Sequence, residues 1–184
     1  PTVLDIPNGL APGVRTASDF LMALQLTGAA KNDSIANMQL RLPVVVIGGG
    51  LTAIDTATES LAYYVVQVEK FLHRYEALAH EIGEDAIRDP WDDYEREIAE
   101  EFLAHARTIR QERKQAESAG REPRIAEMLR HWGGVTIAYR RRADAVGWRL
   151  NGAEEQVQRA VDGAAARYRS TGAVPLEDPN GCGF

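Results

Sequence analysis

The apolar residues of this chain follow two different patterns, one on each side of a run of glycines. Val44–Ile47 is a continuous run of β-branched residues, and this predicts a buried strand of a parallel sheet. From Leu51 to Ile82 the apolar residues recur every three or four positions, which predicts one helix of about 30 residues. Such a helix would be roughly 45 Å long at 1.5 Å per residue, so it should extend beyond the sheet on which it packs.

The same helical spacing returns after a predicted turn at residues 85–90. The apolar positions of 91–109 predict a second long helix, which should end near Ser118, and those of 125–129 predict a short third helix. Two long antiparallel helices joined by a short turn would bury each other's apolar faces. We therefore expect residues 66–131 to form an inserted helical hairpin.

The remaining chain contains one more clear strand, at Val135–Tyr139. Residues 17–24 predict a short amphipathic helix, and residues 28–40 read as a loop. A further helix is expected over 153–170, where the apolar residues are mostly alanine and valine.

These elements predict an α/β fold class. Residues 41–65 and 132–184 would form a partial, Rossmann-like parallel-sheet domain that binds a nucleotide, interrupted by the hairpin of 66–131. Residues 1–40 would be a linking segment. The first residue is Pro1, and we expect the chain to be a piece of a longer protein.

The glycine run has the spacing of a turn that binds the diphosphate of a dinucleotide. Gly48 allows the sharp turn, Gly50 has no Cβ and lets a phosphate approach, and Ala53 lets the helix lie close to the strand. The first amides of the helix and its dipole supply the anion site. An ordinary glycine-rich turn between a strand and a helix is the alternative. The residues expected to contact the dinucleotide here are Gly48, Gly49, Gly50, Leu51, Thr52, Ala53 and Asp55.

Two of these residues have a second interpretation. Thr52 could donate a hydrogen bond to the diphosphate or could only help to start the helix. Asp55 could lie near the nucleotide or could only stabilise the helix dipole.

The residues after the second predicted strand favour one nucleotide over another. In such a unit the tip of the second strand meets the adenine ribose, where a carboxylate selects NAD and an arginine accepts the 2′-phosphate of NADP. Arg140, Arg141 and Arg142 stand at this tip, and guanidinium groups bind phosphate strongly. We therefore expect NADPH rather than NADH. A solvated run of surface arginines is the alternative.

Composition excludes several classes of protein. The formal net charge of −6 argues against nucleic acid as a general partner. No run of about 18 apolar residues is present, so we expect no membrane span. With Cys182 as the single cysteine, neither a disulfide framework nor a CxxC pair is available, which favours a cytoplasmic protein.

Carboxylates and imidazoles occur four positions apart in three places of the predicted hairpin. Such pairs can ligate metal inside a bundle, but the di-iron pattern is Glu-x-x-His, and pairs at i, i+4 are also common on helix surfaces. We therefore assign no metal site, and we find no candidate catalytic residue. The pairs are Glu69 with His73, Glu76 with His80, and Glu101 with His105.

Several segments together resemble a family of flavoproteins. The segments are 4–21, Val46–Asp55 and Val135–Arg141, and they are similar to the NADPH-binding half of glutamate-synthase small-subunit-like proteins. These belong to the FAD-dependent pyridine nucleotide–disulfide oxidoreductases. Leu51 stands where such families often have asparagine, and the insertion is not part of the family pattern.

The resemblance implies a two-nucleotide enzyme in which NADPH passes a hydride to FAD. FAD would be held by a flavin domain of the parent protein, and residues 1–40 would be the crossing from that domain. This chain would then bind NADP(H) and be inactive alone. The alternative is an interaction module, built on a vestigial nucleotide-binding fold, that forms a homodimer through the hairpin of 66–131.

Overall fold

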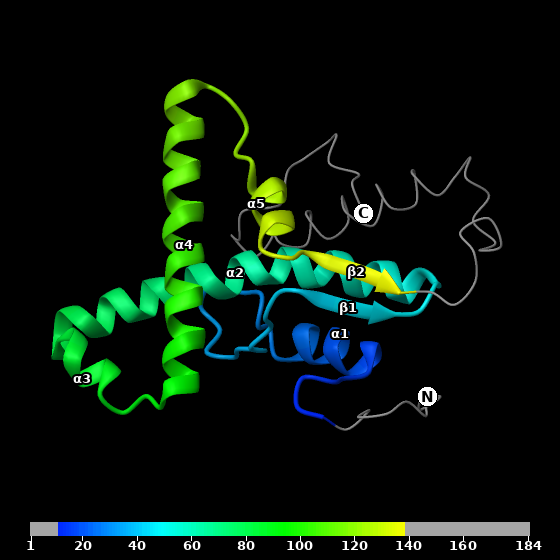
Figure 1. Cartoon of the computed structure of the whole chain (residues 1–184), viewed down its shortest axis with the longest axis horizontal. Coiled ribbons are helices and arrows are strands. Elements are labelled where there is room, and N and C mark those ends of the chain that lie inside the picture. The colour runs from blue at the N-terminus through cyan, green and yellow to red at the C-terminus, as the bar shows by residue number, and fades with distance from the viewer. Residues whose placement is uncertain (1–10, 139–184) are drawn as a thin grey trace.

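The computed structural model describes residues 11–138, which form five helices and two short strands (Figure 1). The elements in chain order are α1 (Ala17–Leu26), β1 (Val44–Ile47), α2 (Leu51–Ile82), α3 (Glu84–Arg88), α4 (Asp93–Ala119), α5 (Ile125–His131) and β2 (Val135–Ala138). Both strands and the four longer helices lie close to their predicted positions. A short helix, α3, joins the two long helices where the sequence predicted a turn. The helix expected over 153–170 lies outside the described residues.

The two strands are parallel neighbours joined through the helices. Their register pairs Val44 with Val135 and Ile47 with Ala138, so both carboxyl ends lie at the same edge. One face of the pair is covered by α2, because Val46 is buried against the first turns of that helix. Val45 and Ile47 point the other way, and their exposed fractions are 62% and 58%.

The Rossmann-like fold class predicted from the sequence is wrong for the described chain. The described residues are mostly helical, and their sheet contains only the four-residue strands β1 and β2. Most burial is between helices, whereas a doubly wound fold buries a broad parallel sheet between two layers of helices.

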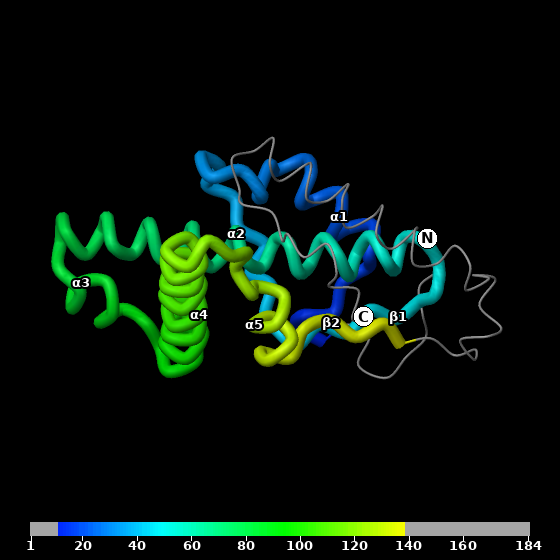
Figure 2. The backbone as a smooth tube through the Cα atoms, turned by 90° about the horizontal axis from the view of Figure 1, so that it is seen from above, coloured from blue at the N-terminus to red at the C-terminus, as the bar shows by residue number. Residues whose placement is uncertain are grey.

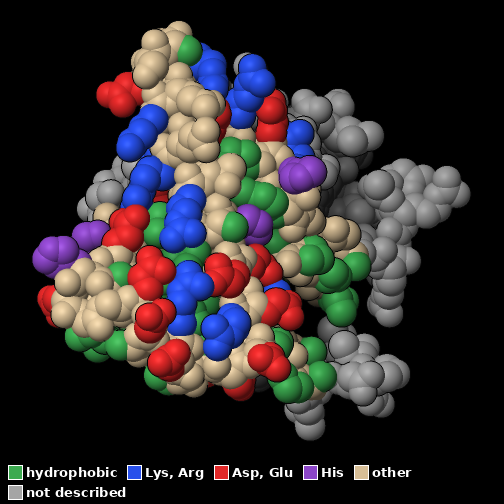
Figure 3. Space-filling view, turned by 60° about the vertical axis from the view of Figure 1, so that its left-hand side comes forward, with side chains coloured by type: hydrophobic (Ala, Val, Ile, Leu, Met, Phe, Trp, Pro, Cys, Tyr) green, Lys and Arg blue, Asp and Glu red, His purple; other side chains and the backbone are tan. Residues whose placement is uncertain are grey.

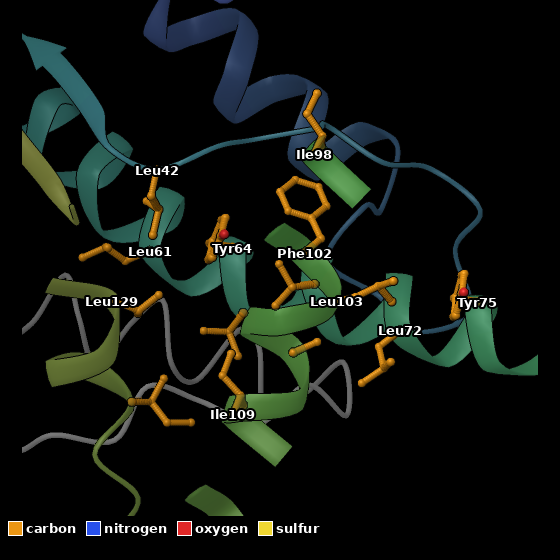
Figure 4. Close-up of a cluster of buried hydrophobic side chains, with 14 residues drawn as sticks. Leu42, Leu61, Tyr64, Leu72, Tyr75, Ile98, Phe102, Leu103, Ile109 and Leu129 are labelled. Carbon is orange, nitrogen blue, oxygen red and sulfur yellow. The ribbon is translucent and has the colours of Figure 1, made fainter. Parts of the chain in front are cut away.

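The main hydrophobic core lies where α4 crosses α2. The two helices cross steeply (Figures 1 and 2), so the expected antiparallel hairpin, with the helices packed along their lengths, is wrong. Tyr64 of α2 meets Phe102 of α4 edge to face, with 6.0 Å between ring centroids. Figure 4 shows Leu61 and Leu129 in the same cluster. The core therefore spans both the predicted 41–65 segment and the predicted insertion.

The apolar stripe of α4 is used inside this chain. Ile98, Phe102, Ala106 and Ile109 are all buried in the main core. The homodimer through residues 66–131 stays a prediction, and this packing does not require it.

Capping residues determine where α4 begins and ends. At its start the Asp92 side chain accepts from the Glu95 amide at 2.7 Å, and the Glu95 side chain accepts from the Asp92 amide at 3.2 Å. This reciprocal capping box satisfies two amides that a helix start leaves unpaired. At its end Gly120 adopts the left-handed conformation with φ +62°, which glycine tolerates best.

Buried polar side chains of α2 hold the 27–40 loop against the helix. The Gln67 side chain accepts from the Leu40 amide at 2.6 Å and donates to the Leu40 carbonyl at 2.7 Å. Lys70 Nζ donates to the Ala29 carbonyl at 2.8 Å, and the Tyr63 hydroxyl accepts from the Met38 amide at 2.8 Å. These bonds compensate for burial of the polar groups.

Ion pairs link the long helices to their neighbours. Arg110 of α4 donates two hydrogen bonds to Glu76 of α2, at 2.7 and 2.9 Å. Arg88 of α3 pairs with Glu100 of α4 at 2.5 Å. With such charged faces, no helix of the described residues combines the length and the apolar character needed to cross a membrane.

Candidate functional site

The turn between β1 and α2 brings the strand and the helix into close contact. The Gly48 amide donates to the Ala138 carbonyl at 3.0 Å, which extends the pairing of β1 with β2 by one residue. A Cβ on Gly48 would lie 3.4 Å from the Cβ of Ala53, and Ala53 itself is buried. Because Gly48 and Ala53 are both small, α2 can start close to β1.

Gly50 is the N-cap of α2, and its surroundings are open. Its backbone is extended, with φ −98° and ψ 178°, and no side chain caps the helix start. A Cβ built on Gly50 would meet no atom within 4 Å. Within residues 11–138, no acceptor is paired with the amides of Leu51 and Thr52. These amides, at the positive end of a long helix, can bind an anion.

The other predicted contacts of this turn are only partly brought together. Leu51 and Thr52 are exposed in the first turn of α2, beside the free amides. Asp55 is exposed one turn further along the helix, outside the first turn. The Thr52 carbonyl accepts from the Thr56 hydroxyl at 2.7 Å, which is a hydrogen bond within the helix.

The predicted arginine cluster lies just beyond the described residues. Arg140, Arg141 and Arg142 are outside 11–138, so their side chains are not placed. The chain reaches Ala138 next to Gly48, at the edge where both strands end. The backbone thus leads toward the arginines from the same edge as the glycine turn.

A half-buried polar cluster between α2, α4 and α5 was not predicted. The Tyr64 hydroxyl and His105 Nδ1 are 2.6 Å apart, and the His105 ring stacks on Trp132 with 3.8 Å between centroids. Arg41 pairs with Glu101 of α4 at 2.5 Å. The four-residue spacing of Glu101 and His105 was the one sign of this cluster in the sequence. Their partners come from distant segments of the chain and are Arg41, Tyr64 and Trp132.

Burial shifts the acid–base properties of this cluster. Burial lowers the pKa of His105 below its ordinary value, and the carboxylate of Glu101 acts in the opposite direction without cancelling this effect. Burial also raises the pKa of the Tyr64 hydroxyl. Both groups are therefore held neutral in the native state, which suits a structural hydrogen bond between them.

We expect His105 to make the protein less stable in mild acid. Because its pKa is lower in the folded chain, the unfolded chain binds more protons as the pH falls below about 6.5. The free energy of unfolding should therefore fall with pH in that range, and this loss should be smaller in His105→Gln. Urea unfolding at several pH values would measure it. His73→Gln, which changes an exposed histidine, should keep the wild-type slope, and equal slopes in all three proteins would contradict the assignment.

The histidine and carboxylate pairs of the long helices do not assemble further. Among residues 11–138, no group of three or more His, Cys, Asp or Glu side chains could hold a metal ion. His105 instead stacks on Trp132 and contacts Tyr64. His73 and His80 are exposed on α2.

Comparison with known proteins gives one similar sequence. Over 152 residues the chain is 43% identical to "Uncharacterized protein RP006" of Rickettsia prowazekii (strain Madrid E). The aligned part covers 82% of this chain but 19% of that protein, so the chain spans about a fifth of its relative's length. No family model matches the chain, and no solved structure matches it.

Proposed function

We propose that this chain binds NADPH, with the diphosphate held by the β1–α2 turn. The observation that carries the proposal is the open start of α2, where Gly50 has no neighbour at its Cβ position and the next two amides are unpaired within the described residues. A diphosphate needs this combination, because its oxygens must approach the backbone and accept from amide groups.

The neighbouring strand supports the choice of nucleotide. β2 pairs with β1 in parallel and ends at Ala138, beside Gly48. In dinucleotide-binding units the adenine ribose lies at the end of the second strand, and an arginine there accepts the 2′-phosphate of NADP. Arg140, Arg141 and Arg142 follow β2 directly in the sequence.

The reaction class is proposed from the resemblance and from the fact that this chain spans only about a fifth of its relative's length. The segments that resemble glutamate-synthase small-subunit-like flavoproteins include both the glycine turn and β2. We infer that the parent protein is an FAD-dependent oxidoreductase. NADPH would supply a hydride to a flavin held by another part of it. In this arrangement the residues of this chain bind and orient the coenzyme, and none is assigned a catalytic role.

A comparison of the two reduced coenzymes tests the proposal. Fluorescence titration should give a lower dissociation constant for NADPH than for NADH. Changing Arg140, Arg141 and Arg142 together to glutamine should weaken NADPH binding and leave NADH binding unchanged, because only the 2′-phosphate contact is removed. Equal wild-type affinities would refute the choice of nucleotide, and no binding of either coenzyme would refute the proposed function.

A further inference from the structure

The apolar stripe of α2 continues past the point where the described protein covers it. Its members recur alternately three and four positions apart as far as Ile82. Tyr75 is the last buried member, and the Trp91 ring and the Arg88 guanidinium lie against its ring. The next two members, Leu78 and Ile82, have exposed fractions of 46% and 57%. In coiled coils a stripe of this spacing packs against a second helix, and this part of the stripe has none.

The exposed pair, Leu78 and Ile82, lies on a part of the molecule that projects from the rest. Figures 1 and 2 show the distal end of α2 and α3 extending past α4, on the side away from the two strands. The glycine turn is at the other end of the same helix. The exposed pair is therefore separate from the proposed NADPH site.

The segment around the end of α2 is strongly acidic. Residues 81–97 contain eight carboxylates and two arginines. Figure 3, in which this end of the molecule comes forward, shows Asp and Glu side chains gathered over the lower half of the view. Of the eight carboxylates, only Glu84 and Glu97 form an ion pair within residues 11–138. Most of this negative charge is therefore uncompensated in the described protein.

Helix capping explains only part of this charge. Asp92, Asp93 and Glu95 lie at the start of α4, where carboxylates stabilise the helix dipole. Glu81 lies in the last turn of α2, where the negative end of the dipole disfavours a carboxylate. Glu81 is also three positions from Leu78, so the two side chains are neighbours on the helix surface. This carboxylate beside an exposed leucine fits a partner that carries a basic group beside an apolar one.

We propose that the exposed pair docks a basic amphipathic helix of a partner protein. The apolar residues of that helix pack on Leu78 and Ile82, and its Lys or Arg side chains pair with Glu81 and with other carboxylates of 81–97. In coiled coils the charged residues beside the apolar stripe select the partner in this way. A second copy of this chain would bring the same negative charge, so repulsion disfavours it as the occupant of this surface.

A designed peptide tests this docking surface. The probe is a fluorescent peptide of three heptads, with leucine at the apolar positions and lysine beside them, and a matched peptide has glutamate in place of lysine. Fluorescence anisotropy should show saturable binding of the lysine peptide and no binding of the glutamate peptide. Leu78→Ser combined with Ile82→Ser should weaken binding about tenfold, because the apolar contact is lost. Glu81→Gln should weaken it about threefold, because one exposed ion pair is lost.

Matched changes elsewhere separate this surface from a general attraction between opposite charges. Met22 and Leu26 of α1 are also an exposed apolar pair four positions apart. Glu117 of α4 is also an exposed carboxylate without an ion pair among residues 11–138. Met22→Ser combined with Leu26→Ser, and Glu117→Gln alone, should bind the lysine peptide as the wild type does. Circular dichroism should show that all variants keep the wild-type helix content.

Three outcomes would overturn the proposal. The first is equal binding by the variants of the two apolar pairs, and the second is equal binding of the lysine and glutamate peptides. The third is a dimer in light scattering that dissociates when Leu78 and Ile82 are changed, because a second copy would then occupy the surface. NADPH titration of the same variants should give the wild-type affinity, so this surface and the coenzyme site can succeed or fail independently.

Discussion

Gly50→Ser is expected to abolish most NADPH binding while leaving the fold at least as stable. The position has an extended backbone and open space at Cβ, so the new side chain meets no part of the described protein. Serine is also a favourable N-cap, which should raise the free energy of unfolding by a few tenths of a kcal/mol. The same side chain would occupy the space of the diphosphate and compete for the amides of α2.

The expected loss of affinity is about a hundredfold, or about 2.7 kcal/mol. This corresponds to the loss of one or two charge-assisted hydrogen bonds from amides to phosphate. Isothermal titration with NADPH would measure it, and urea unfolding would confirm that the variant is folded. A folded Gly50→Ser protein with wild-type affinity would show that the coenzyme does not use this turn.

The local elements around this turn could be predicted because short-range patterns determine them. The β-branched run of Val44–Ile47 became β1 with the predicted bounds. The unbroken helical spacing after Leu51 became a helix of 32 residues that ends before Gly83. The turn between β1 and α2 depends on the small size and backbone conformation of Gly48, Gly50 and Ala53. Both properties follow from the residue type alone.

The arrangement of the long helices could not be predicted in the same way. An apolar stripe indicates which face of α4 is buried, but it does not give the angle at which that face crosses α2. The stripe of Ile98, Phe102 and Ile109 fits a steep crossing as well as a hairpin. With α4 placed across α2, burial is mostly helix on helix, which is why the predicted fold class failed.

Buried polar residues were also beyond a pattern-based prediction. Gln67 and Lys70 read as surface positions of a long helix, yet both are buried. Their partners, Leu40 and Ala29, are 27 and 41 residues away in sequence. The contact of Tyr64 with His105 is likewise long-range. Such pairs become visible only after the chain is folded.

Gly133→Ala is expected to lower the free energy of unfolding by roughly 3 kcal/mol, the largest stability change that we predict. Gly133 has φ +107°, and its Cβ would lie 2.9 Å from the Cβ of Pro43 and 3.3 Å from its Cα. The backbone strain contributes about 1–2 kcal/mol and the overlap another 1–3 kcal/mol. Gly133 and Gly134 lead directly into β2, so relief of the overlap would move β2 away from β1.

Gly83→Ala separates the two contributions. Gly83 also has a positive φ, +86°, but its Cβ would meet nothing within 4 Å. This variant should therefore lose only a backbone-strain component, about 1–3 kcal/mol for a residue with φ +86° and ψ 153°. Urea unfolding of both variants would measure the difference, and equal losses would contradict the close contact with Pro43. Because β2 positions Ala138 beside Gly48, Gly133→Ala should also weaken NADPH binding, whereas Gly83→Ala should not.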